Sequence, residues 1–203
     1  MKWKATYSLS LIYFALAASD VAAQQTVNQV VGPIDVPASL AAEAEDARAD
    51  TPAVTRAIRL NPEELARTHL PVISIGTRNS AVRAAPYGMA SLGNSYVLNA
   101  TVDGSTLSLT GTRLKSEDSG GADNPNFNQA NNAEPCRFSP LTEADEDDEP
   151  GGAKEYAADC SWFRFGASYN LRLTCRGPSD TRCSEPEFLQ SAAAAQVVVK
   201  GGE

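Results

Sequence analysis

The sequence lacks the residues and motifs that most enzyme classes require. It has one histidine, His69, whereas a serine hydrolase needs a serine, a histidine and an acid in one constellation. It contains no GxSxG segment, no P-loop and no GxGxxG segment. We interpret His69, which follows a short predicted helix, as a helix cap or a surface residue. These absences favour a binding or interaction protein without a cofactor over an enzyme.

Long apolar runs are also scarce. Residues 7–18 form one run after a basic start, and small residues at 21–23 precede Gln24. This pattern is typical of a secretory signal peptide that is cleaved near Ala23. The run is too short for a membrane span, and no second run follows. We therefore expect no transmembrane segment, and a bacterial periplasmic or secreted protein.

Basic residues are outnumbered by acidic ones, 17 to 25, which gives a formal net charge of −8. Removal of residues 1–23 takes away two lysines and one aspartate and leaves the chain one unit more negative. Nucleic acids and anionic membranes attract clusters of lysine and arginine. The acidic balance therefore argues against both as partners.

The four cysteines form no CxxC pair, and with a single histidine they make a poor zinc site. In an exported chain the expected state is two disulfides. Cys175 and Cys183 bracket a turn-rich segment, which favours the pairs Cys175–Cys183 and Cys136–Cys160. The main rival, Cys160–Cys175, is disfavoured by the hairpin register chosen below, which places Asp159 opposite Cys175.

Composition divides the chain into a leader, one domain and a short tail. Residues 24–52 are rich in Ala, Gln, Glu and Asp and offer little to bury, which predicts a flexible leader. The expected domain covers residues 53–199, with an acidic and Asn-rich insertion at 116–153 and a frayed tail at 200–203. Asn61 followed by Pro62 predicts a helix over 62–68, with asparagine as the N-cap. Residues 72–75 predict a short strand, and residues 78–93 predict a loop.

Asp103-Gly104 separates two alternating runs, 96–102 and 105–112, which predicts a hairpin with a type I′ turn. Pairing about this turn places Val102 opposite Ser105. One face then carries the apolar residues Tyr96, Leu98, Ala100, Val102, Leu107 and Leu109.

Residues 161–165 and 169–175 predict a second hairpin. A turn over 166–168 buries Phe163 and Phe165 beside Tyr169 and keeps the arginines in water, whereas a two-residue turn buries Arg164. We therefore predict the three-residue turn. It places Trp162 on the polar face with Arg164 and Arg172, where an indole can stack on a ring and arginines can bind carboxylates. These three residues are our candidate ligand-binding site, although an exposed tryptophan can also be covered by a loop or by an arginine.

The run of acids at 143–149 raises the question of calcium, since hard cations prefer clustered carboxylates. Asp145, Asp147 and Glu149 are the candidate ligands. The acids are consecutive rather than spaced as in an EF-hand loop, so a solvated loop is the preferred interpretation.

Near the C-terminus, Ser184 and Glu187 resemble a capping box that begins a helix with Phe188, Leu189 and Ala192 on its buried side. Residues 197–199 predict a last strand. Together these elements predict a mainly β, disulfide-linked domain with one short helix near each end. Whether its strands form a single sheet, a sandwich or a barrel stays open.

Four segments together resemble a group of exported bacterial proteins of unknown function: 67–72 (RTHLPV), 111–113 (GTR), 163–175 (FRFGASYNLRLTC) and 180–183 (DTRC). The resemblance covers about 67–202. It implies that the aromatic hairpin and the cysteine-closed loop belong to one unit, and it implies no activity.

Three functions follow as hypotheses. The first is a non-enzymatic binding module for an envelope protein, a peptide or a glycan. The second is an envelope glycan hydrolase that uses a pair of acids, with Asp103, Asp159 and Glu155 as candidates. The third is a structural subunit of an envelope assembly that is bound through a sheet edge.

Overall fold

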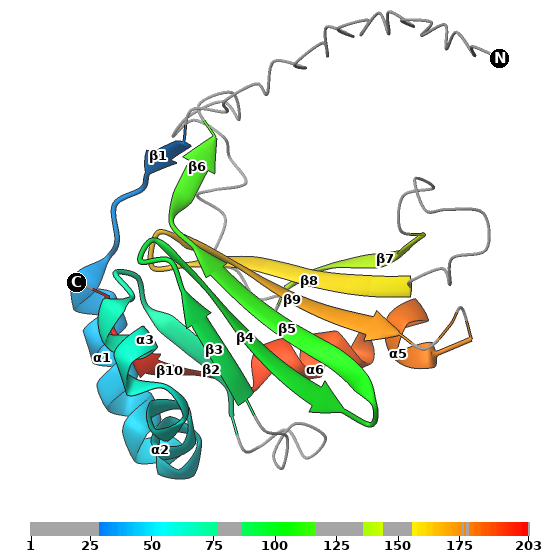
Figure 1. Ribbon diagram of the computed structural model, residues 1–203, viewed down its shortest axis with the longest axis horizontal. Coiled ribbons are helices and arrows are strands. Elements are labelled where there is room, and N and C mark those ends of the chain that lie inside the picture. Colours follow the sequence, from blue (N-terminus) through cyan, green and yellow to red (C-terminus); the bar gives the residue numbers. More distant parts are fainter. Residues whose placement is uncertain are drawn as a thin grey trace, which may run out of the picture.

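The computed structural model describes residues 29–76, 87–116, 136–143, 156–175, 177 and 179–202. Its main feature is a six-stranded antiparallel sheet in the order β3-β4-β5-β9-β8-β7 (Figure 1). In that order the strands are β3 (Tyr87–Ser91), β4 (Ser95–Val102), β5 (Ser105–Thr112), β9 (Ala167–Cys175), β8 (Tyr156–Arg164) and β7 (Arg137–Glu143). The mainly β fold predicted from the sequence is confirmed.

Two smaller antiparallel sheets and five helices complete the described part of the chain. The small sheets pair β2 (Val72–Ile75) with β10 (Gln196–Lys200), and β1 (Gln29–Val31) with β6 (Leu114–Ser116). The helices are α1 (Val36–Ala49), α2 (Thr51–Leu60), α3 (Pro62–Arg67), α5 (Thr181–Ser184) and α6 (Glu187–Ala194). In Figure 1, α6 and the β2–β10 pair lie behind the six-stranded sheet. We call the sheet face that they cover the inner face and the opposite face the outer face.

The core lies between the inner face and these covering elements. The β4–β5 hairpin has the predicted register, with Val102 opposite Ser105 and Leu98 opposite Leu109. All six apolar residues predicted for one face of this hairpin are buried. From the other side the core receives Leu189, Ala192 and Ala193 of α6 and the side chains of β2 and β10. The valines at 197–199 are in β10, as predicted, and all three are buried.

Tyrosine hydroxyls join the large sheet to β2. The Tyr96 hydroxyl accepts a hydrogen bond from Ile73 N at 2.8 Å and donates one to Ile73 O at 3.2 Å. The Tyr169 hydroxyl donates to Pro71 O at 3.0 Å. Burial raises the pKa of both hydroxyls well above the ordinary value, so both stay protonated at neutral pH. The backbone groups of Ile73 and the carbonyl of Pro71 therefore find their hydrogen-bond partners in tyrosine side chains.

Gly111 makes room for this arrangement. It lies between the two tyrosines in one row across the sheet, paired with Tyr96 on one side and Tyr169 on the other. A Cβ atom at Gly111 would overlap Cε1 of the Tyr96 ring, well inside van der Waals contact. The glycine thus allows the Tyr96 ring to lean across β5 towards β2.

The β8–β9 hairpin corrects our predicted register. Arg164 pairs with Ala167, so the turn consists of Phe165 and Gly166 alone. Both have positive φ angles, 55° and 81°, as a type I′ turn requires. The inner face therefore receives Trp162 rather than Phe163. Arg164 is only half-buried at the end of the strand, so the predicted penalty for burying an arginine does not arise.

The N-terminal segment contacts this turn. Asp35 N donates to Phe165 O at 3.0 Å, and a Cβ at Gly166 would overlap Pro33 O. Because the two segments are far apart in the sequence, this contact cannot be predicted from residues 161–175 alone.

Both predicted disulfides are present, Cys136–Cys160 and Cys175–Cys183. The pairing was right, although the register used to argue for it was wrong. Cys175 lies opposite Tyr156 rather than opposite Asp159. Cys160 is on the inner face, fully buried, and its partner Cys136 is buried as well.

The predicted flexible leader is wrong from residue 29 onwards. Residues 36–52 belong to α1 and the start of α2, and α1 packs along β10. Asp50 is buried between the two helices, where its side chain accepts from Ala53 N. Residues 24–28 lie outside the described part of the chain. The leader prediction failed because residues 36–49 have no apolar stripe, whereas the side of α1 that packs on the rest of the fold is polar.

Four further local predictions can be compared with the structure. The helix that begins at Pro62 has Asn61 as its N-cap, as predicted. Ser184 does not cap a helix: it ends α5, whose N-cap is Asp180, and α6 has no side-chain cap. The predicted loop at 78–93 contains β3, while 77–86 lie outside the described residues. The tail predicted to fray is ordered as far as Gly202, and Gly201 and Gly202 are buried.

Arg113 fastens three segments at one end of the sheet. Its Nε donates to Gly32 O at 3.0 Å and its Nη1 donates to His69 O at 3.1 Å. Its backbone N donates to Asn94 O at 3.0 Å, and its carbonyl accepts from Gly32 N at 2.8 Å. The N-terminal segment, the α3–β2 connection and the β3–β4 turn are thereby held together.

We predict that Tyr96→Phe lowers the free energy of unfolding by about 1–3 kcal/mol, because it leaves Ile73 N–H buried without a partner. Urea unfolding of the parent and the variant measures the difference. Tyr156→Phe is the matched control, since the Tyr156 side chain is half-buried and makes no hydrogen bond to a described residue. Equal effects of the two substitutions would contradict the role given to the Tyr96 hydroxyl.

A second prediction concerns Gly111→Ala. The added methyl group meets the Tyr96 ring, so we expect a loss of about 1–3 kcal/mol, typical of overpacking. Gly88→Ala is the control, because Gly88 is also in a strand and a Cβ there meets nothing within 4 Å. Thermal melts of both variants provide the comparison, and a Gly111→Ala protein as stable as Gly88→Ala would refute the crowding argument.

Candidate functional site

The outer face of the six-stranded sheet is a polar surface built from the central strands. None of the helices lies on it in Figure 1. Alternation along the strands gives this face short polar side chains, and many of them are exposed. The central four strands contribute Asn99, Thr101, Thr106, Ser108, Thr110, Asn170, Arg172, Thr174, Asp159 and Ser161.

Strand register aligns one set of these residues across the sheet. Asn99 on β4 pairs with Ser108 on β5, Ser108 pairs with Arg172 on β9, and Arg172 pairs with Asp159 on β8. Asn170 and Ser161 form the next pair along β9 and β8. We call this set the polar strip: Asn99, Ser108, Asp159, Ser161, Asn170 and Arg172.

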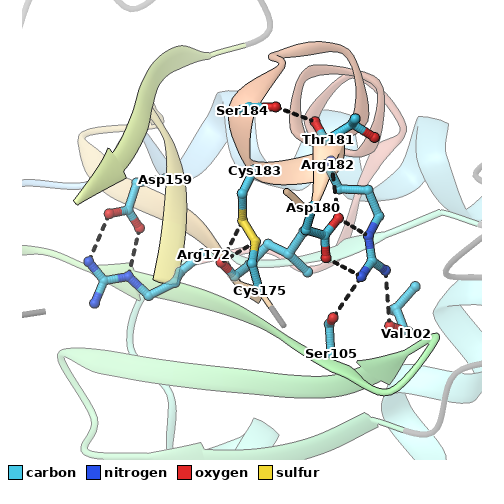
Figure 2. Close-up of a disulfide and its surroundings, with 11 residues drawn as sticks. Val102, Ser105, Asp159, Arg172, Cys175, Asp180, Thr181, Arg182, Cys183 and Ser184 are labelled. Atoms are coloured by element: carbon cyan, nitrogen blue, oxygen red, sulfur yellow. Dashed lines mark hydrogen bonds and ion pairs between the residues drawn. A yellow bond between two sulfur atoms is a disulfide. The ribbon is translucent and has the colours of Figure 1, made fainter. Parts of the chain in front are cut away.

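Hydrogen bonds hold the side chains of the polar strip in place. Arg172 donates to both carboxylate oxygens of Asp159, from Nε at 2.9 Å and from Nη2 at 2.8 Å. Figure 2 shows this pair on neighbouring strands. Asn170 Nδ2 donates to Asp159 Oδ1 at 3.0 Å, and Ser161 Oγ donates to Asn170 Oδ1 at 2.8 Å. On the other side of the strip, Ser108 Oγ donates to Asn99 Oδ1 at 2.6 Å.

The electrostatics of the strip are set by the Arg172–Asp159 pair. Partial burial acts to raise the pKa of Asp159, but the bonds from Arg172 and Asn170 outweigh it and hold the pKa below its ordinary value. The bond to Asp159 raises the pKa of Arg172. Both groups are therefore charged at neutral pH.

Unused hydrogen-bonding capacity faces the solvent. A guanidinium has five N–H donors, and the two bonds to Asp159 leave Nη1 of Arg172 without a described partner. The Arg172 side chain is 52% exposed, whereas that of Asp159 is 21% exposed. The strip therefore presents a cationic fork, with amide and hydroxyl groups to either side.

The structure separates the three residues of the predicted ligand site. Trp162 is on the inner face, 8% exposed, and stacks on Tyr169 with ring centroids 5.8 Å apart. It is not a platform for a ligand, because the two-residue turn inverts its strand relative to our prediction. Its indole Nε1 is buried and has no partner among the described residues.

Arg164 is also displaced from the predicted site. It shares the inner-face side of β8 with Trp162, and its guanidinium lies over the Phe165 ring, 4.5 Å from the centroid. Only Arg172 occupies the polar face as predicted.

The candidate acids do not meet one another among the described residues. Asp103 is at the tip of the β4–β5 hairpin, with its side chain 82% exposed and 4.0 Å from Arg182. Asp159 is engaged by Arg172, and its lowered pKa is the opposite of what a general acid needs. Glu155 and the calcium candidates Asp145, Asp147 and Glu149 lie outside the described residues. His69 is exposed at the surface, as expected.

A second polar cluster surrounds Arg182, and its role is structural. Arg182 donates to both carboxylate oxygens of Asp180, at 2.9 and 2.6 Å, and to Ser105 Oγ at 2.8 Å. The bond to Ser105 attaches α5 to the β4–β5 hairpin, and the Cys175–Cys183 disulfide beside it attaches α5 to the end of β9 (Figure 2). The bonds to Asp180 raise the pKa of Arg182.

Sequence reasoning missed Asn99, Ser108, Asn170 and Ser161 as members of a site. The alternation of polar and apolar residues assigns each of them to the polar side of its strand, so the sequence did indicate which face they occupy. The pairing of β5 with β9 could not be predicted, because the two strands are more than fifty residues apart and neither sequence indicates its partner.

Among the residues that the structure describes, no group of histidine, cysteine and acidic side chains has the arrangement of a metal site. The described helices include none with the length and apolar character of a membrane span. No protein-family model, curated protein or solved structure matches this chain.

We predict that the Asp159 carboxyl titrates below the ordinary value of about 3.9 and moves upwards in Arg172→Gln. Because the folded-state pKa is lowered, ionised Asp159 stabilises the fold at neutral pH, and this contribution is lost as the pH falls through that pKa. Carbon-detected NMR titration of the carboxyl group measures both midpoints. An unchanged midpoint in Arg172→Gln would show that Arg172 does not control the charge of Asp159.

Proposed function

We propose that this protein is an exported, non-enzymatic binding module that holds an anionic glycan on the polar strip. The observation that carries the proposal is the hydrogen-bonded set of Asn99, Ser108, Asn170, Asp159 and Arg172 on an exposed sheet face. Its side chains are already ordered by one another. A ligand that binds there meets a smaller entropy cost than it would on independent surface side chains.

The chemistry of the face favours a ligand with hydroxyl groups. Serine, threonine and asparagine side chains both donate and accept hydrogen bonds, as sugar hydroxyls do. The threonines Thr101, Thr106 and Thr174 extend the same chemistry beside the strip, since they form one row across β4, β5 and β9. A flat row of short polar groups fits an extended chain of sugars better than it fits a compact molecule.

The charges of the face favour a ligand with carboxylates. The charged residues on the outer side of the described strands are Arg137, Arg172 and Asp159, whereas the whole chain has a net charge of −8. Arg137 pairs with Ser161 on the edge strand β7, is exposed, and forms no ion pair with a described residue. Strand spacing and rise place it about 12 Å from Arg172, so one extended ligand can reach both guanidinium groups. Guanidinium groups bind carboxylates in a planar, two-point geometry.

The position of Trp162 supports an anionic glycan over a neutral one. With its indole on the inner face, the polar strip has no tryptophan on which a sugar ring can stack. Binding on the strip itself then relies on hydrogen bonds and charge, and the aromatic side chain that shares this side of β8 is Phe163, two residues from Ser161. This replaces the stacking platform that the sequence suggested.

The two rival functions have less support. A hydrolase needs one carboxyl group with a raised pKa, and the pKa of Asp159 is lowered. A subunit bound through an edge of the six-stranded sheet needs a free edge. Side chains of α3 bond to the edge of β3, with Asn61 Nδ2 donating to Met89 O and Ser91 N donating to Glu64 Oε2. The opposite edge strand, β7, is interrupted by an irregularity between Ser139 and Thr142.

Export is part of the proposal. Disulfides persist in oxidising compartments, and both pairs here are buried within the domain. Together with the basic start and apolar run of the sequence, they favour a periplasmic or secreted protein that is cleaved near Ala23.

The test is calorimetric titration of the chain from Gln24 onwards with oligogalacturonate, an anionic glycan, and with maltohexaose, a neutral one. We expect binding of the anionic glycan and a 10–100-fold weaker affinity in Arg172→Gln, since a hydrogen bond to a charged group contributes about 1.5–3 kcal/mol.

Arg67→Gln is the matched control, because Arg67 is an exposed, ion-paired arginine on α3, away from the outer face. Equal losses in the two variants would point to non-specific charge attraction. Binding of maltohexaose alone would contradict the anionic ligand, and binding of neither glycan would contradict the proposal.

A further inference from the structure

The two arginines of the outer face are held differently. Arg172 is fixed by Asp159, to which it donates from Nε at 2.9 Å and from Nη2 at 2.8 Å. Arg137 is exposed on the edge strand β7 and forms no ion pair with a described residue. Two strand spacings and one step of two residues along the strands separate them, about 12 Å in all. A ligand that reaches both arginines therefore presents its carboxylates at two separate points.

The surface between the two arginines is acidic. Strand β8 lies between β9 and β7, and it places Asp159 and Ser161 there. A carboxylate can accept about four hydrogen bonds, and Asp159 accepts three from described residues. Two come from Arg172, and the third comes from Asn170 Nδ2 at 3.0 Å. The capacity that remains, on Oδ2, suits a hydroxyl or an amide N–H of a ligand.

This arrangement restricts the charge that a ligand can carry between its two ends. The bonds from Arg172 and Asn170 hold the pKa of Asp159 below its ordinary value, so the carboxyl group is charged at neutral pH. A ligand carboxylate placed over β8 would face this charge and be repelled. A neutral group with hydroxyls would instead donate a hydrogen bond to Asp159. The face therefore favours a carboxylate at each arginine and a neutral group between them.

We propose that the ligand is a glycan in which sugars with a carboxylate alternate with neutral sugars, and that Asp159 selects this pattern. A sugar in an extended chain advances by roughly one strand spacing, so two carboxylates on either side of one neutral sugar span the distance from β9 to β7. The Arg137 side chain is not fixed and can adjust to the offset along the strands. The inference rests on the proposed function, since it concerns the same face, and it adds the order of charged and neutral sugars.

The test is calorimetric titration of the chain from Gln24 onwards with two anionic tetrasaccharides. In the hyaluronan tetrasaccharide glucuronate alternates with N-acetylglucosamine, whereas tetragalacturonate has a carboxylate on every sugar. N-acetylchitotetraose, which has no carboxylate, is the neutral control. We expect hyaluronan to bind at least about fivefold more tightly than tetragalacturonate, although it carries half the charge, because its neutral sugar avoids repulsion by Asp159.

Variants separate the contributions of the three charged residues. We expect Arg137→Gln to weaken the hyaluronan tetrasaccharide about 10–100-fold and to leave the hyaluronan disaccharide unchanged, since the shorter ligand does not reach β7. Arg172→Gln weakens both. Asp159→Asn keeps the shape of the side chain and one acceptor oxygen, and we expect it to remove the preference for hyaluronan over tetragalacturonate. Arg67→Gln is the matched control and leaves all affinities unchanged.

The results distinguish this inference from the proposed function. Tetragalacturonate that binds as tightly as hyaluronan, and loses affinity in Arg172→Gln, would overturn the alternating pattern and leave the proposed function in place. An unchanged preference in Asp159→Asn would show that Asp159 does not select the ligand. Absence of binding by every anionic glycan would contradict the proposed function, and this inference with it.

Discussion

The hydrogen bonds of two buried tyrosine hydroxyls are the constraint on which the rest of this fold depends. Strand β2 has β10 on one side and none of the described strands on the other, and Tyr96 and Tyr169 supply hydrogen-bond partners there for Ile73 and Pro71. Since both tyrosines stand on the six-stranded sheet, the bonds fix where the small sheet lies on the large one. The small sheet, α6 and the core then occupy the inner face. None of the described helices covers the outer face, and the candidate site is there.

The sequence predicted those parts of the fold that are decided locally. Asp103-Gly104 can form only a few kinds of turn, and its register followed correctly. Asn61 and Pro62 predicted the start of α3 for the same reason. The β8–β9 register was wrong because residue 33 contacts the turn from far away in the sequence. A local clue to the correct register did exist: Cys160 and Trp162 share a face, and a buried disulfide belongs to the core.

The candidate site was predicted only in part. Alternation placed Arg172 on the polar side of its strand, and the structure agrees. Its partner Asp159 was considered as a catalytic acid, because the sequence does not show which carboxylate an arginine will meet across a sheet. Helix α1 was missed for a related reason. The residues of α1 that face the rest of the fold are Ser39, Glu43 and Asp46, which accept hydrogen bonds from backbone N–H groups. Because these residues are polar, the sequence shows no buried apolar stripe from which the helix could be predicted. The segments of the noted resemblance contain Arg113 and Arg182, and both of these arginines join separate segments of the fold.

Because the polar strip is built on regular strands, its side chains can change over generations without a change of fold. Its side chains come from four strands whose positions are set by backbone pairing and by the core behind them. Replacing Asn99 or Ser108 by another short polar residue changes the hydrogen-bonding groups that the surface presents and leaves the backbone pairing in place. Surface chemistry and folding are thus encoded by alternate residues of the same strands. A lineage of such proteins is free to vary its outer face one outward residue at a time, while the inward residues keep one architecture.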